Sequence, residues 1–184
     1  MLVDPRRGGA LIGVVGGLVF VFSYAPPLGR AAFLTSSIVG VALALSALLL
    51  LYVRPTSLGS FRQPTRTALL VYGCCVVGEL VAIAVGSRLL LSLGHSELRP
   101  ALIAAVVGVH FLPFAWAFGE RMFYRLGLVL VVLGCTGLVA GWAGLGLAAG
   151  AAAVLSGLAM LALLVQYGRG RFARRPSRLG TARP

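Results

Sequence analysis

Two side chains in this sequence have a type and a spacing that allow chemistry inside a membrane. Glu79 is the one acidic residue within an apolar run, and His110 lies near the middle of the next run. A carboxylate and an imidazole that meet can share a proton, and a charged side chain at the bilayer centre is costly and usually faces other helices. We therefore interpret Glu79 and His110 as a candidate intramembrane polar pair.

The positions of these two residues predict that they lie at one depth. Glu79 precedes Arg88 by nine residues, and His110 follows Pro100 by ten. At 1.5 Å per residue, both lie about 14–15 Å from the same membrane edge, near the middle of a hydrocarbon core of about 30 Å. Consecutive antiparallel helices joined by a short loop pack together, which predicts contact between the two side chains.

The surroundings of the pair suggest a larger polar network. Hydroxyl groups on neighbouring runs are candidate members: Tyr72, Tyr124, Ser92, Thr35, Ser36 and Ser37. Pro113 follows His110 by three residues, and it predicts a helix kink and a free carbonyl near residue 109 because proline has no backbone N–H.

Two interpretations of the pair stay open. The functional one is a proton relay or substrate counter-ion in a small carrier. The structural one is a polar clamp between two helices. Transporters usually contain inverted repeats and broken helices, and no convincing repeat links the two halves of this chain.

Enzyme signatures are missing from the sequence. It contains no HExxH, GxSxG or P-loop motif, and two histidines with four acids leave few ways to build a catalytic site. Cys74, Cys75 and Cys135 lie in apolar runs without a CxxC motif, where cysteine behaves as a small hydrophobe. We expect no enzymatic activity, no cofactor and no metal site; a membrane-embedded enzyme is the least favoured alternative.

The composition requires lipid as the solvent for most of the chain. Of its 184 residues, 59% are hydrophobic and 11% are charged, and the mean hydropathy is +1.00. Soluble domains carry about 25% charged residues, so one globular core cannot cover this much apolar surface. The chain is therefore expected to be a polytopic membrane protein.

The apolar runs predict an all-α bundle of six transmembrane helices. The last apolar run, residues 126–168, contains 43 residues and no formal charge. As one helix it would be about 65 Å long, roughly twice the hydrocarbon thickness. The glycine-rich stretch 141–146 must therefore be a turn. The predicted spans are Gly8 to Ala25, Ala31 to Val53, Thr67 to Ser87, Pro100 to Gly119, Leu126 to Gly141 and Leu147 to Tyr167. A cleaved signal peptide is the alternative for the first span, but Pro26 would obstruct cleavage after Ala25.

The arginines predict the orientation. With both termini in the cytoplasm, 13 of the 16 arginines lie on the cytoplasmic side, as the positive-inside rule requires for a multi-pass protein of the cytoplasmic membrane. We expect one transmembrane domain, residues 1–168, and a basic, disordered cytoplasmic tail, residues 169–184. The tail is expected to bind anionic lipid head groups, and not nucleic acid, through Arg169, Arg171, Arg174 and Arg175.

Glycines at four-residue spacing predict where helices approach closely, because small residues let backbones meet in lipid. Gly9, Gly13 and Gly17 form one such stripe, and Gly137 with Gly141 forms another. Packing within one chain is one interpretation, and contact between copies in a homo-oligomer is the other.

The stretch from Pro100 to Gly127 carries the pattern VGxHFxPxAxxF, followed by a polar segment with an aromatic residue and a glycine. The matching positions are Val107, Gly108, His110, Phe111, Pro113, Ala115, Phe118, Tyr124 and Gly127, with Gly78 and Glu79 in the preceding helix. In this the chain resembles a group of small, uncharacterised bacterial integral membrane proteins that are frequent in actinobacteria. The resemblance covers roughly residues 70–130; it implies a membrane location and names no substrate.

Overall fold

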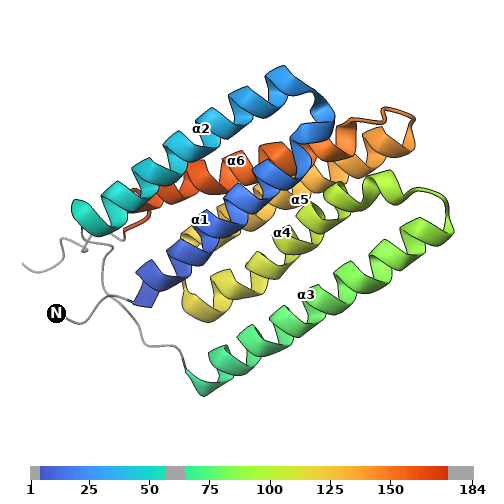
Figure 1. Ribbon diagram of the computed structural model, residues 1–184. Helices are drawn as coiled ribbons and strands as arrows, with labels where there is room; N and C mark the ends of the chain where they lie inside the picture. The colour runs from blue at the N-terminus through green and yellow to red at the C-terminus, as the bar shows by residue number, and fades with distance from the viewer. Residues whose placement is uncertain (1–4, 57–64, 174–184) are drawn as a thin grey trace, which may run out of the picture.

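The computed structural model describes residues 5–56 and 65–173, and the long elements within them are six α-helices (Figure 1). All six are long and apolar enough to cross a membrane, so the predicted all-α bundle of six spans is confirmed. A π-helical turn, Leu49–Val53, extends the second helix. The helices are α1 (Pro5–Tyr24), α2 (Arg30–Leu48), α3 (Arg66–Ser92), α4 (Arg99–Phe118), α5 (Arg121–Trp142) and α6 (Ala148–Gly168).

Two helices are longer than their apolar runs predicted. Helix α3 continues through Arg88 to Ser92, and α5 begins at Arg121 instead of Leu126. Arginine side chains near a membrane edge can reach the head groups along their own apolar stems, so a charge does not end a spanning helix. Limits set at the first charge were therefore too short.

Helix α6 lies in the middle of the bundle, and α2 and α3 lie at opposite edges (Figure 1). More than half of the residues of α6 are buried, and this helix packs against α1, α2, α4 and α5. By contrast, the buried residues of α3 are Ala68 and Ser87, and its main neighbour is α4. Helix α3 is thus a peripheral helix attached along one side.

The start of α1 and the end of α6 lie at the same end of the bundle, here called the terminal end (Figure 1). The Tyr52 hydroxyl donates to the carbonyl oxygen of Arg7 at 2.8 Å, and the Thr56 hydroxyl donates to that of Gly168 at 2.6 Å. Both contacts join the end of the second span to one end of the chain. This placement is what an even number of spans requires.

The first predicted glycine stripe holds at two of its three positions. A Cβ atom on Gly17 would lie 2.8 Å from Leu161 Cγ, and one on Gly13 would lie 3.2 Å from Leu164 Cδ1, so both glycines face α6. Nothing lies within 4 Å of a Cβ on Gly9, which is exposed near the start of α1. Within one chain Gly9 is thus not part of the packed stripe, and its role in contact between copies stays a prediction.

The second pair of predicted glycines also lies in a helix contact. A Cβ on Gly137 would lie 2.5 Å from Ala152 Cβ, and one on Gly141 would meet Leu98. These contacts join α5 to α6 and to the segment before α4. Both are packing contacts within one chain.

The closest helix approach, between α4 and α5, was not predicted. A Cβ on Gly108 would lie 2.6 Å from the Val131 backbone nitrogen, and one on Gly127 would lie 2.7 Å from the Gly108 carbonyl oxygen. Gly134 faces the backbone of Ala105 in the same way. The two backbones are in direct contact here, as small residues permit.

The bundle extends a few residues past the boundary predicted at residue 168. Phe172 is buried, and the Arg125 guanidinium lies 5.1 Å from the centre of its ring. Arg169 and Arg171 are exposed beside it, whereas Arg174 and Arg175 lie outside the described residues. Lipid binding by these arginines stays a prediction.

Candidate functional site

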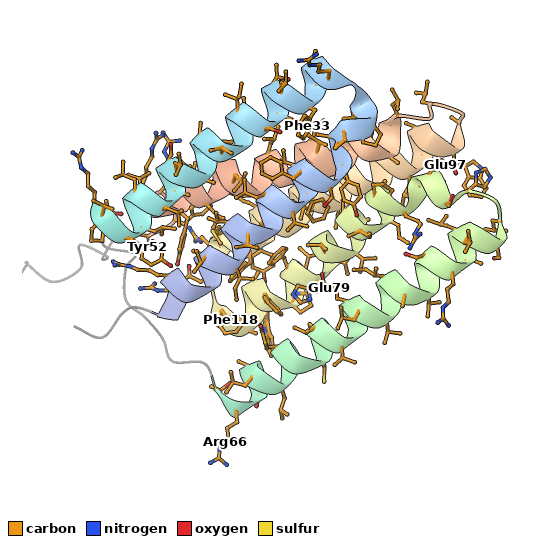
Figure 2. All side chains as sticks on the ribbon, in the orientation of Figure 1. Phe33, Tyr52, Arg66, Glu79, Glu97 and Phe118 are labelled. Atoms are coloured by element: carbon orange, nitrogen blue, oxygen red, sulfur yellow. The ribbon has the colours of Figure 1, made fainter. Side chains whose placement is uncertain are left out.

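Glu79 of α3 and His110 of α4 meet in the interior of the helix pair. His110 Nδ1 lies 3.1 Å from Glu79 Oε2, and the two side chains are 9% and 19% exposed, respectively. Figure 2 shows Glu79 between α3 and α4, well away from Arg66 at one end and Glu97 at the other. The structure therefore brings together the two residues that were predicted to pair.

A backbone carbonyl determines which nitrogen of His110 carries a proton. Nδ1 also lies 3.2 Å from the carbonyl oxygen of Cys75, one turn before Glu79 on α3. Because a carbonyl oxygen only accepts hydrogen bonds, Nδ1 must be the donor, shared between this oxygen and Glu79.

Aromatic rings cover the pair on the side of the terminal end. The His110 ring lies 4.2 Å from that of Phe114 and 5.5 Å from that of Phe111, measured between centroids. The Tyr72 ring stacks on Phe114 at 4.9 Å. We call this group the aromatic cluster; its members are Tyr72, Phe111, Phe114, Phe118 and Phe123.

The aromatic cluster has a signal in the sequence that was not used. Phe111, Phe114 and Phe118 have the spacing i, i+3 and i+7, which places them on one face of a helix. Periodicity of this kind is hard to see in a helix that is apolar all round, because the lipid-facing residues are equally hydrophobic.

The attachment of α3 to α4 follows a seven-residue spacing. Tyr72, Glu79 and Gly86 meet Phe114, His110 and Leu102 in turn, and a Cβ on Gly86 would lie 2.7 Å from Leu102 Cδ2. The residue numbers of the partners on α4 decrease as those on α3 increase, as in an antiparallel helix pair. The polar pair occupies the middle of this contact line.

The hydroxyl groups predicted to extend the network do not reach the pair. Thr35 and Ser36 donate to carbonyl oxygens of their own helix, at 2.8 and 2.7 Å, on the far side of the bundle. Ser92 likewise donates to Leu89, and Tyr72 packs within the aromatic cluster. Serine and threonine in helices bond to the preceding turn, which satisfies them locally. The hydroxyl oxygen of Ser37 is buried on α2 without a hydrogen-bond partner among the described residues, and Tyr124 is half exposed.

Helix α4 continues through Pro113 to Phe118. Since proline has no N–H, the carbonyl oxygen of Val109 lacks its usual donor four residues later. This free acceptor lies next to His110 in the chain. A kink at this position stays a prediction.

The other acidic side chains within the described residues lie at the two ends of the bundle. Glu120 accepts from Arg6 at 3.2 Å at the terminal end, and Glu97 lies 3.0 Å from His95 at the opposite end. Among residues 5–56 and 65–173, no three His, Cys, Asp or Glu side chains lie close enough to hold a metal ion together.

Six apolar helices, with α6 in the middle of the bundle, define a multi-pass α-helical membrane protein. The model of the family of unknown function DUF7010 matches residues 67–166, which is more than half of the chain, and the protein belongs to this family. The match includes Glu79, His110 and the whole aromatic cluster. No curated protein and no solved structure matches the chain.

Proposed function

We propose that this protein is a non-catalytic integral protein of a bacterial cytoplasmic membrane, with both termini in the cytoplasm. Its Glu79–His110 pair acts as a polar clamp that holds the peripheral helix α3 on the bundle. The observation that carries the proposal is the 3.1 Å contact between the two side chains, in the middle of the line along which α3 meets α4.

Three features support a clamp. The Cys75 carbonyl keeps Nδ1 of His110 as a donor towards α3, so the bond points across the helix interface. The aromatic cluster packs against the imidazole and restricts its rotation. In addition, α3 has little buried surface elsewhere, and an unpaired carboxylate in hydrocarbon is costly, so separation of the two helices is penalised.

A proton-linked carrier is the second candidate. It is favoured by the exposure that Glu79 keeps, 19%, about twice that of His110. A carboxylate next to an imidazole can exchange protons once water reaches the pair. Small movements of a helix attached along one side would then alter access to the pair.

A double-mutant cycle tests the clamp. Glu79→Gln and His110→Ala should each lower the free energy of unfolding in detergent micelles, and the double variant should lose less than the sum. The expected coupling is about 0.6 kcal/mol and below about 1.7 kcal/mol, the range of interhelical polar contacts in membranes. Glu97→Gln and His95→Ala provide a matched control at an exposed pair, for which we expect a smaller coupling. Strictly additive losses at Glu79 and His110 would overturn the clamp.

Proton flux separates the clamp from the carrier. The purified protein is placed in liposomes that contain a pH-sensitive dye, and a pH gradient is applied. The clamp predicts that the native protein and Glu79→Gln leak protons equally slowly. A flux that Glu79→Gln abolishes, with the helical circular dichroism unchanged, would establish the carrier instead.

A further inference from the structure

A groove runs between α3 and α4 in the half of the bundle away from the terminal end. It has a volume of about 320 Å³, and all but two of its lining residues are apolar or small. The lining residues are Leu80, Ile83, Ala84, Ser87, Arg88 and Leu91 of α3 and Arg99 of α4.

The length of this groove corresponds to one leaflet of a bilayer. From Leu80 to Leu91 the helix rises about 16 Å at 1.5 Å per residue, and half of the hydrocarbon core is about 15 Å. Leu80 follows Glu79 directly, so the inner end of the groove lies at the depth of the polar pair. The outer end lies near the last turn of α3.

The two arginines give the outer end of the groove a strong positive charge. Arg88 and Arg99 continue the antiparallel order in which Gly86 meets Leu102, so they lie at one level on either side of the groove. Within the described residues neither arginine forms an ion pair, and Glu97, the acid nearest in the chain, pairs with His95. Guanidinium groups bind phosphate oxygens through paired hydrogen bonds.

We propose that this groove binds one anionic phospholipid, with an acyl chain along α3 and the phosphate between Arg88 and Arg99. The apolar lining favours a lipid over a free phosphate ion, because it continues to the bilayer centre. The predicted topology places three arginines on the outer side of the membrane, and two of them line this groove. The bound chain would also cover Ile83, one turn from Glu79, and so shield the lipid-facing side of the polar pair.

Native mass spectrometry of the full-length protein in detergent tests this proposal, with phosphatidylglycerol as the probe. Arg88→Gln and Arg99→Gln should each weaken binding about fivefold, since each arginine near the surface contributes a factor of this size. The double variant should bind more weakly than either single variant. Arg30→Gln is the matched control; this exposed arginine begins α2 at the same end of the bundle and does not line the groove. The control should bind as the native protein does.

A second pair of variants tests the position of the acyl chain without changing charge. Ala84→Phe fills the groove and should lower lipid binding, whereas Val85→Phe, on the neighbouring exposed face of α3, should not. The proposal is overturned by equal effects of the two phenylalanines, or by an equal effect of Arg30→Gln and Arg88→Gln. Equal binding of phosphatidylethanolamine, or displacement of the lipid by inorganic phosphate, would also overturn it.

Discussion

Replacing Gly108 by alanine should separate α4 from α5. The added Cβ would lie 2.6 Å from the Val131 backbone nitrogen and 2.9 Å from the Gly127 carbonyl oxygen. Carbon atoms need about 3.5–4.0 Å, so one helix must move outward by about 1 Å. Backbone atoms cannot rotate away as a side chain can. Overpacking of this kind costs about 1–3 kcal/mol.

Gly73→Ala is the control for this substitution. Nothing lies within 4 Å of a Cβ on Gly73, so the variant gains only the helix preference of alanine, about 1 kcal/mol at most. The difference in unfolding free energy between Gly108→Ala and Gly73→Ala therefore isolates the clash. Reversible unfolding with SDS in mixed micelles, followed by circular dichroism, measures it. Equal stability of the two variants would refute direct backbone contact between α4 and α5.

Three further outcomes follow from the described contacts. Along α1, Gly9→Ala should not lower stability, because the added Cβ meets nothing. Gly13→Ala should lower it slightly because Leu164 can shift, and Gly17→Ala should lower it most because it meets the Gly157 carbonyl oxygen; SDS unfolding gives the order, and a loss at Gly9 equal to that at Gly17 would contradict it. Glu120→Gln should cost less than about 1 kcal/mol, and high salt should reduce the difference, since the ion pair with Arg6 lies at the bundle end. In a variant without its native cysteines, Ser96→Cys should react with an impermeant thiol reagent from outside intact cells and Ala173→Cys should not; the reverse pattern would overturn cytoplasmic termini.

The number of helices could be predicted because each span is a long apolar run, and the length of a helix is limited by the bilayer. The common depth of Glu79 and His110 could also be predicted, and the cost of turning a carboxylate towards lipid favoured contact between them. Equal distances from one membrane edge on consecutive helices determine a common level whatever the rotation of each helix. Helix α3 extends five residues beyond its predicted end at Ser87. This error did not change the predicted common depth of the two side chains, because α4 also begins near the same membrane edge.

The helix neighbours could not be predicted from the same information. Gly108 and Gly127 do not stand in a four-residue repeat with another glycine, yet they lie in direct backbone contact between α4 and α5. Gly9 stands in such a repeat and contacts nothing. Which face of a uniformly apolar helix turns inward depends on its neighbours, and lipid provides no contrast that would mark the buried side. The groove with Arg88 and Arg99 was missed for this reason, because it exists only when α3 and α4 lie side by side.

The position of the polar pair follows from how α3 is held. In water, burial of apolar surface would attach this helix, but in lipid the exchange of a lipid neighbour for a helix neighbour releases little free energy. Gly86 allows close approach near one end of α3, and Tyr72 stacks on Phe114 near the other. Glu79 lies midway between them, where exposure to hydrocarbon is most costly. The proposed clamp would therefore act mainly by making the separated state unfavourable, and it would add to the contacts that Gly86 and Tyr72 already make along this helix of 27 residues.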